Sequence, residues 1–310
     1  MRLASLDPQG PVAAEIADLW WILLAIGSAV FVLFLVVLFR GLTRISPPKG
    51  GSTRAQRGGG GRILLIGGGV VLPSVVVAVV FALTLIAMRS LPVAGSSERL
   101  VVEITGYQWW WDVVYPDQRI RTANEIYVPV GEEVELVLLS ADVVHSFWVP
   151  AIAGKTDLLP DRPTSMVIEA GESGNYRGVC AEFCGLQHAR MAFTFVAVDE
   201  AQFANWLETQ SQPALDPATD DSVRGREVFL ESGCANCHRI DGTSTAEIGP
   251  DLTHLASRLT LAAGTFPNTT DHLRNWVSRP QELKEGVAME NIALSADDLD
   301  SLIVYLESLE

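Results

Sequence analysis

The hydrophobic pattern begins with two long apolar stretches near the N-terminus. Leu19–Phe39 and Ile63–Met88 contain no charged residue. Each exceeds the roughly 17 to 20 apolar residues that a helix needs to cross a bilayer, and each is longer than the apolar part of a signal peptide. We therefore predict transmembrane helices at about residues 19–39 and 63–88. Buried helices of a soluble domain are the alternative, although such helices rarely run so long without a charge.

Beyond these stretches the pattern changes to short alternating runs. Between residues 99 and 198, β-branched and aromatic residues alternate with polar ones, as in RLVVEITGYQWWWDVVY, EEVELVLLS and MAFTFVAVD, and Pro and Gly separate the runs. This pattern predicts a small β-sandwich. A short helix is expected over Glu200–Gln210, and the Pro-, Ala- and Asp-rich SQPALDPATDD indicates a linker.

The last part of the chain has a helical period. Three helices are predicted here, over VRGREVFLESG, DHLRNWVSRP and SADDLDSLIVYLESL. Ser295 with Asp298 is expected to cap the last one. The predicted fold class is a multidomain membrane protein with a two-helix transmembrane hairpin, a β-sandwich and an all-α domain. The predicted divisions are an N-terminal tail and transmembrane helices at 1–98, the sandwich at 99–200, a linker at 201–220 and the helical domain at 221–310.

Charge is distributed unevenly between the two ends of the chain. The segment between the apolar stretches has no acidic residue and carries Arg40, Arg44, Lys49, Arg54, Arg57 and Arg62. The positive-inside rule places this loop in the cytoplasm and both termini outside. Residues 89–310 hold 15 Lys/Arg and 34 Asp/Glu, a net charge of −19. This acidity disfavours nucleic-acid binding. It suits a basic partner, although ordinary solubility charge explains it equally well.

Soft metal donors gather in VCAEFCGLQHARM, which contains Cys180, Cys184, His188 and Met191. A cupredoxin copper site uses His, Cys, His and a weak axial Met, and His145 in VVHSFWVP supplies the distant histidine. The second thiolate allows both sulfurs to bridge two copper ions. A Cys180–Cys184 disulfide is an alternative, with poor geometry for cysteines four residues apart. Zinc is another, although zinc does not prefer methionine.

Three stretches of this part resemble the cupredoxin-like CuA domain of cytochrome c oxidase subunit II. They are GYQWWWDVVY, VHSFWVPAIAGKTDLLPDRP and YRGVCAEFCGLQHARM. The resemblance covers about residues 14 to 200. It implies binuclear copper ligated by His145, Cys180, Glu182, Cys184, His188 and Met191. In the family the glutamate binds copper through its backbone carbonyl, and its side chain reaches a Mg or Mn ion at the contact with subunit I.

The same resemblance assigns roles outside the copper loop. Trp109 matches the tryptophan through which electrons enter, whereas Trp110 and Trp111 are better explained as core or interfacial residues. Asp157 and Arg162 match a segment that faces subunit I, or else belong to a solvated loop.

One departure from the family lies near the start of the second apolar stretch. The family usually has a glutamate there that is associated with proton entry, and Ile66 occupies that neighbourhood in this chain. No Asp or Glu occurs between Leu19 and Ser97, so an acid that admits protons would have to come from elsewhere.

A second site is predicted by SGCANCHRI, in which Cys234, Cys237 and His238 form the C-x-x-C-H motif of covalent haem c. A zinc site or a redox dithiol is the usual alternative, but no second C-x-x-C completes a zinc site. Residues 221–310 resemble a class I cytochrome c, and the proline carbonyl in GPDLTHL then orients the axial histidine.

The sixth iron ligand should be a methionine or histidine downstream of the motif. Met289 is the expected ligand, and His254 and His272 are its competitors. The family usually places a proline directly after this methionine, whereas this chain has Glu290.

Together these features resemble subunit II of an aa3/caa3-type oxidase, in which a cytochrome c domain is fused to the CuA domain. The resemblance implies electron transfer from a cytochrome c or a bc1-type complex through haem c and CuA to subunit I. Subunit I, which contains haem a and the haem–copper centre, reduces O2 and pumps protons, and subunit III completes the complex. The expected location is the bacterial cytoplasmic membrane, with the N-terminus and both redox domains on the periplasmic side.

Three other functions are compatible with parts of the sequence. A CuA and haem c subunit of a nitric oxide reductase would have the same relay. A quinol oxidase subunit II would share the fold without the copper ligands. A membrane-anchored adhesion or assembly module would hold zinc and a disulfide in place of the redox groups.

Overall fold

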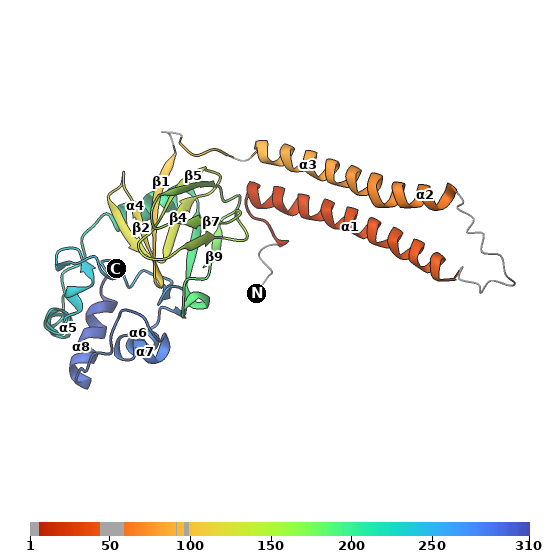
Figure 1. The fold of residues 1–310 in the computed structure, drawn as a ribbon. Helices are drawn as coiled ribbons and strands as arrows, with labels where there is room; N and C mark the ends of the chain where they lie inside the picture. Colours follow the sequence, from red (N-terminus) through yellow and green to blue (C-terminus); the bar gives the residue numbers. More distant parts are fainter. Residues whose placement is uncertain (1–5, 44–58, 91, 96–98) are drawn as a thin grey trace. The chain divides into compact units, whose positions relative to one another are not determined.

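The computed structural model describes residues 6–43, 59–90, 92–95 and 99–310 (Figure 1). It divides into two compact units, one made of residues 14–91 and the other of residues 92–310 with the residues up to Ala13. Four basic residues of the predicted cytoplasmic loop lie outside the described residues: Arg44, Lys49, Arg54 and Arg57.

The first unit is helical. Its elements are α1 (Pro11–Thr43), α2 (Gly59–Ile66), a π-helical turn η2 (Gly67–Val71) and α3 (Leu72–Ser90). Two helical segments, Pro11–Thr43 and Gly61–Arg89, are long and apolar enough to cross a membrane. Their large apolar side chains, such as Phe31 and Phe39, are exposed, which suits contact with lipid and does not suit the core of a soluble protein.

The π-helical turn lies directly before Pro73. Proline has no N–H to donate and clashes with the preceding helical turn. Leu72 accordingly donates its N–H to the carbonyl of Gly67, five residues earlier. The wider turn therefore accommodates the proline within one continuous helical segment.

The β-sandwich of the second unit has two five-stranded sheets. The first has the order β3-β2-β1-β5-β8 and the second the order β4-β10-β9-β6-β7. The first sheet consists of β1 (Leu100–Tyr107), β2 (Trp110–Tyr115), β3 (Ile120–Ala123), β5 (Val134–Ser140) and β8 (Thr164–Ile168). The second consists of β4 (Glu125–Pro129), β6 (His145–Trp148), β7 (Thr156–Leu158), β9 (Gly174–Cys180) and β10 (Ala192–Val198).

Alternating side chains form the core between the sheets. In β5 every second residue is buried, as the alternation of VELVLLS predicts. Trp111, Phe147 and Phe193 are almost fully buried and their rings contact one another, with centroids 4.7 to 6.2 Å apart. The cluster adjoins the predicted copper donors, because Phe147 shares β6 with His145 and Phe193 lies in β10, the strand that follows Met191.

The helix α4 (Glu200–Gln210) has the bounds that the sequence predicts. The side chain of Asp199 caps it by accepting a hydrogen bond from the N–H of Gln202. Trp206 stacks on Tyr127 of β4, with ring centroids 4.5 Å apart. The helix is therefore attached to the sandwich.

The C-terminal part is mainly helical, and α5 (Asp220–Glu231) lies beside α8 (Ala296–Glu307) (Figure 1). The rings of Phe229 and Tyr305 join these helices, with centroids 6.0 Å apart. The side chain of Ser295 caps α8 by accepting the N–H of Asp298, as the sequence predicts. The helices are α5 (Asp220–Glu231), η4 (Cys234–Asn236), α6 (Thr270–Ser278), α7 (Pro280–Leu283) and α8 (Ala296–Glu307). Short strand pairs are formed by β11 (Arg239–Ile240) with β12 (Ser244–Thr245) and by β13 (Thr260–Leu261) with β14 (Phe266–Pro267).

Candidate copper and haem sites

The predicted copper donors come from two neighbouring strands and one loop. His145 begins β6 and Cys180 ends β9, and these strands pair with Phe147 opposite Cys180. The loop after β9 carries the remaining donors up to Met191, directly before β10. Strand register therefore places His145 near Cys180, although 35 positions separate them in the chain.

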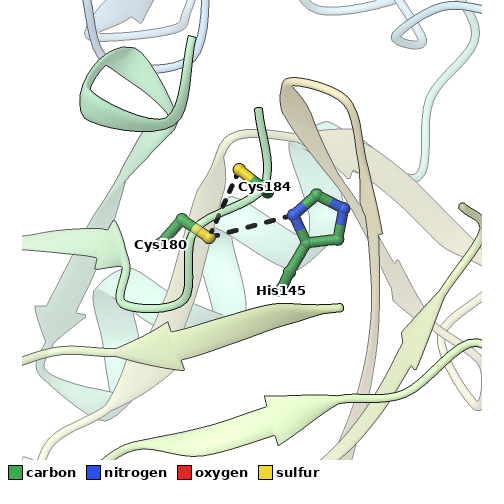
Figure 2. A group of neighbouring side chains, drawn as sticks. All are labelled: His145, Cys180 and Cys184. Carbon is green, nitrogen blue, oxygen red and sulfur yellow. Dashed lines mark hydrogen bonds between the residues drawn. The ribbon is translucent and has the colours of Figure 1, made fainter. Parts of the chain in front are cut away.

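Cys180 lies at the centre of the group drawn in Figure 2. Its Sγ is 3.7 Å from Sγ of Cys184 and 3.8 Å from Nδ1 of His145. The backbone carbonyl oxygen of Glu182 is 3.2 Å from the same sulfur. One sulfur thus has an imidazole nitrogen and a carbonyl oxygen beside it.

Cys184 has a different pair of neighbours. Its Sγ is 3.7 Å from Nδ1 of His188 and 3.7 Å from Sδ of Met191. Both cysteines are almost fully buried. The loop therefore presents two donor sets that share two sulfurs, which is what a sulfur-bridged metal pair requires.

An acidic side chain orients His145. The Nε2 atom of His145 is 2.8 Å from Oδ1 of Asp142, while Oδ2 of Asp142 accepts the N–H of Gln108 at 2.7 Å. Burial lowers the pKa of His145, but the hydrogen bonds to Cys180 and Asp142 outweigh it and raise the pKa overall. Because the Asp142 carboxylate accepts a hydrogen bond from Nε2–H, Nδ1 is the ring nitrogen that faces the sulfur of Cys180 and can act as a ligand.

The two thiol groups hydrogen-bond to each other, which lowers the pKa of Cys180 and raises that of Cys184. Cysteine binds a soft cation as the thiolate, so metal binding releases the thiol protons. The sulfur separation is far above the roughly 2.05 Å of a disulfide, and both cysteines are free. Thiolate, thioether and imidazole donors together fit copper better than zinc.

The C-x-x-C-H motif borders a cavity of about 490 Å³. This volume lies in the range of cofactor sites, about 300 to 1,000 Å³. The cavity is lined by Cys234, Cys237, His238 and Met289, together with apolar side chains such as Leu273. Both thiols and both expected iron ligands therefore border one space.

The axial histidine is held in a defined tautomer. Nδ1 of His238 is 2.8 Å from the carbonyl oxygen of Pro250. A carbonyl only accepts hydrogen bonds, so Nδ1 carries the proton and Nε2 is left to bind iron. Burial lowers the pKa of His238 and so favours the neutral ring. A Cβ at Gly249 would lie 2.8 Å from the ring, so only glycine permits this close approach.

Three residues compete for the sixth iron position. His254 is buried, and its two ring nitrogens lie 2.7 and 3.1 Å from the backbone oxygens of Glu310 and Gln212. His272 stacks on Phe266, and its Nδ1 contacts Thr269. Of these three candidates, all in the described part of the chain, Met289 is the one that lines the cavity.

Two residues that line the cavity, Arg258 and Thr260, each have a buried polar atom, Nε and Oγ1 respectively, without a hydrogen-bond partner among the described residues. A buried polar atom without a partner is unfavourable, so such atoms are usually satisfied by a ligand or a water molecule. Haem carries two carboxylates. A buried guanidinium beside the cavity therefore fits haem by charge as well as by position.

Trp109 connects the two sites. Its indole N–H donates to the carbonyl oxygen of Cys184 at 2.9 Å, and the side-chain amide of Gln108 donates to the same oxygen at 2.7 Å. Trp109 also lines the haem cavity. By contrast, Trp110 stacks on Tyr107, and Trp111 is completely buried in the core.

Other residues predicted from the family lie at the surface. Asp157, Arg162 and the side chain of Glu182 are exposed. Ile66, at the position where the family has a glutamate, ends α2 and is about half exposed.

The sequence reasoning missed three contributors: Asp142, Gln108 and Lys284. Asp142 stands three residues before His145, and Gln108 directly precedes the predicted tryptophan, so proximity in the sequence was an available signal. Lys284 is almost fully buried against Trp109, and nothing in the surrounding sequence marks it.

Comparison with known proteins gives two family matches. The family described as cytochrome c oxidase subunit II, periplasmic domain, matches residues 118–198, and the cytochrome c family matches residues 222–310. Cytochrome c oxidase subunit 2 of Alkalihalophilus pseudofirmus is 34% identical over 319 residues, covering 100% of this chain and 91% of the relative. Quinol oxidase subunit 2 of Bacillus spizizenii is 32% identical over 215 residues, covering 67% and 66%.

Among solved structures, the periplasmic domain of subunit II of cytochrome oxidase (CoxB) of Bradyrhizobium japonicum matches with a TM-score of 0.36 and 30% identity. That match covers 38% of this chain and 96% of the other. The full-length relative and the two family matches carry the assignment. The chain belongs to the cytochrome c oxidase subunit II family, with a cytochrome c domain following the copper domain as in the caa3 type.

Proposed function

We propose that this chain is the electron-transferring subunit II of a caa3-type terminal oxidase. Electrons pass from a cytochrome c to the haem c site, then to the CuA site, and finally to subunit I, where O2 is reduced and protons are pumped. The observation that carries the proposal is the position of Trp109, which lines the haem cavity and hydrogen-bonds to the carbonyl of Cys184. The chain itself is a relay.

The residues around each site would hold a redox group and set its potential. When bound, the haem iron and the copper pair each take up and release one electron. Cys234 and Cys237 would attach the haem, and His238 and Met289 would ligate its iron. A methionine partner raises the potential, which suits a protein that receives electrons from another cytochrome.

On the copper side, the proposed ligands are His145, Cys180, the carbonyl of Glu182, Cys184, His188 and Met191. Asp142 hydrogen-bonds to the His145 ring, and the ring of Trp111 packs beside it with centroids 6.1 Å apart. Small movement between oxidation states is what a fast electron relay requires.

The wider setting follows from the family and the charge. The family and the two apolar helices indicate a membrane-anchored protein. We propose that its redox domains face the periplasm, that subunits I and III are its neighbours, and that a cytochrome c or a bc1-type complex is its donor. The exposed Asp157, Arg162 and Glu182 are the proposed contacts to subunit I, with Glu182 contributing to a Mg or Mn site there. The domain divisions at 98, 200 and 220 remain our proposal, although α4, which begins at the second division, packs on the sandwich through Trp206.

A reciprocal pair of substitutions tests the relay. The purified full-length chain should contain one haem c and a copper pair, as measured by optical spectroscopy and metal analysis. Cys184→Ser should abolish the copper signature and leave the haem, because one of the two sulfurs that would hold the copper pair is lost. Cys237→Ser should disrupt haem attachment and leave the copper. Normal copper in Cys184→Ser would contradict the ligand assignment, and a metal-free wild-type chain from a host able to mature both groups would contradict the function.

The alternative partner is the large subunit of a nitric oxide reductase. The comparisons give it no support, since the full-length relative is an oxidase subunit. The reaction of the copurifying large subunit decides the matter: consumption of O2 supports the oxidase, and consumption of nitric oxide without O2 supports the reductase.

A further inference from the structure

Lys284 is buried where the haem domain meets the copper domain. It follows α7, and its side chain is about 1% exposed. Its Nζ donates to the backbone carbonyl of Trp109 at 3.0 Å and to that of Ala262 at 3.0 Å. One ammonium group therefore ties a loop of the haem domain to the residue that separates the two redox sites.

Burying this lysine is unfavourable unless its donors are satisfied. Burial, with Arg190 nearby, lowers its pKa to about 7, whereas the charge of Cys184 acts in the opposite direction. An ammonium group and a neutral amine both have enough N–H bonds for two carbonyls. The contact therefore does not depend on the charge of the lysine.

The residues beside Lys284 extend the same contact along the copper loop. The side chain of Arg190 donates to the carbonyl of Leu283, and that of Gln187 donates to the carbonyl of Glu285 at 2.7 Å. A Cβ at Gly286 would lie 3.3 Å from Leu186 and 3.6 Å from the Trp109 ring. The segment 283–286 thus follows residues 186–190 closely.

This contact covers Trp109, which is only 9% exposed. In this arrangement the indole is in contact with the haem cavity and the copper loop, and an external protein has little access to it. The haem domain thus covers the tryptophan that the family resemblance assigns to electron entry.

We propose that Lys284 is a positioning residue. Its hydrogen bonds to the carbonyls of Trp109 and Ala262, here called the latch, hold the haem domain against Trp109, so that electrons reach the copper site by way of the haem domain. This inference rests on the proposed relay. One electron leaves the reduced haem site and reduces the oxidised copper site, and no bond forms or breaks. Lys284 takes no part in the redox step and acts only by holding Trp109 against the cavity.

Lys284→Met in the full-length chain with both groups bound is the main test. Methionine keeps much of the apolar stem and removes the donors to both carbonyls. Arg279→Met is the matched control, because Arg279 is an exposed cation five residues earlier whose side chain bonds within the haem domain, to Asn275. Two quantities are measured: the rate of haem-to-copper electron transfer after photochemical injection of one electron, and amide hydrogen exchange in residues 107–111 and 260–265.

For Lys284→Met we expect transfer to slow by about tenfold or more, because two buried carbonyls lose their donor and the docked arrangement becomes less populated. Exchange in both segments should rise, while the haem and copper spectra stay unchanged. Arg279→Met should match the wild type in every respect. A Lys284→Met variant with wild-type transfer and exchange would overturn the latch. A wild-type chain that passes no electron from haem to copper would instead overturn the relay itself.

A second variant decides the matter if Lys284→Met fails to retain both groups. Gly286→Val introduces a side chain between the segment and Trp109 and strains a backbone with φ of 83°. Slower transfer with raised exchange in residues 107–111 supports the latch, and wild-type behaviour overturns it.

Discussion

The copper and haem sites are built in different ways, although they share a wall at Trp109. The copper donors are close-packed, with sulfur-to-donor distances of 3.2 to 3.8 Å, and four of the five donor side chains come from residues 180–191. The haem site is a cavity of about 490 Å³, lined by residues from 108 to 306. One site is formed by two neighbouring strands and the loop that follows one of them, and the other by two domains together.

This difference predicts which substitutions should alter each site. Strand pairing and hydrogen bonds within the sandwich hold the copper donors, so changes in the haem domain should leave copper binding intact. The haem cavity is lined by residues of both domains, so a change in a lining residue of either domain should alter the haem environment. The following substitutions examine this asymmetry.

Met289→Leu should have the largest effect and should be confined to the haem site. Leucine has a similar volume and does not ligate iron, while Cys234 and Cys237 still hold the haem. The midpoint potential should fall by roughly 0.1 V, a fraction of the about 0.8 V range that axial ligands span. Redox titration measures the potential, and the copper spectrum should not change. His272→Gln is the control, and a fall in that variant with none in Met289→Leu would contradict the ligand assignment.

Asp142→Ala tests a residue that supports the copper site without being one of its proposed ligands. The substitution removes the carboxylate that accepts hydrogen bonds from Nε2–H of His145 and from the backbone N–H of Gln108. Loss of such a partner typically weakens metal binding by about 10- to 100-fold. Competition with a copper chelator measures the affinity, while the haem spectrum should remain that of the wild type. Glu182→Gln, which alters an exposed side chain and keeps the backbone carbonyl, is the control. An unchanged affinity in Asp142→Ala would show that strand register alone orients His145.

The sequence predicted local features well and long-range contacts poorly. Alternation in VELVLLS predicted a half-buried strand, and the bounds of the helix Glu200–Gln210 and the Ser295 cap were confirmed. These features depend on a few adjacent residues. The packing of Trp206 on Tyr127 depends on how distant segments meet, which no local pattern records.

The same distinction applies to the candidate sites. Soft donors within twelve residues pointed to a metal loop, because such side chains rarely gather without one. Nothing in QELKEG marks Lys284 as buried, since its burial follows from the docking of two domains. The role of Asp142 lay between these cases, as its position near His145 was visible and the direction of its side chain was not.

Glu125→Gln tests the boundary between the two domains through pH. Glu125 accepts the N–H groups of Leu259 and Thr260 at 2.6 and 3.2 Å. Burial raises the pKa of this carboxyl to about 7, although Arg258 and these hydrogen bonds act in the opposite direction. Between about pH 4.5 and 7 the folded chain therefore holds a proton that the unfolded chain has lost. The free energy of unfolding contributed by this group is fully present below that window and declines as pH rises through it.

The glutamine variant lacks this titration, so its stability relative to the wild type should increase by about 1 to 3 kcal/mol between pH 4.5 and 7.5. Denaturant unfolding of the detergent-solubilised chain, followed at both pH values, measures the difference. Glu103→Gln, an exposed position in β1, should show no such change. A relative stability that is independent of pH would contradict the raised pKa of Glu125.

Glu247→Gln should have the smallest effect, because it removes only an exposed contact between the domains. Arg121 lies 2.7 Å from Glu247 and retains its ion pair with Asp112 at 2.9 Å when the first contact is lost. Glu247 is 58% exposed, and such pairs contribute under about 1 kcal/mol. The change in unfolding free energy should stay below that value and shrink further in high salt, and haem-to-copper transfer should slow by less than about twofold. A loss comparable to that of Lys284→Met would mean that surface charge, and not the buried lysine, holds the haem domain against Trp109.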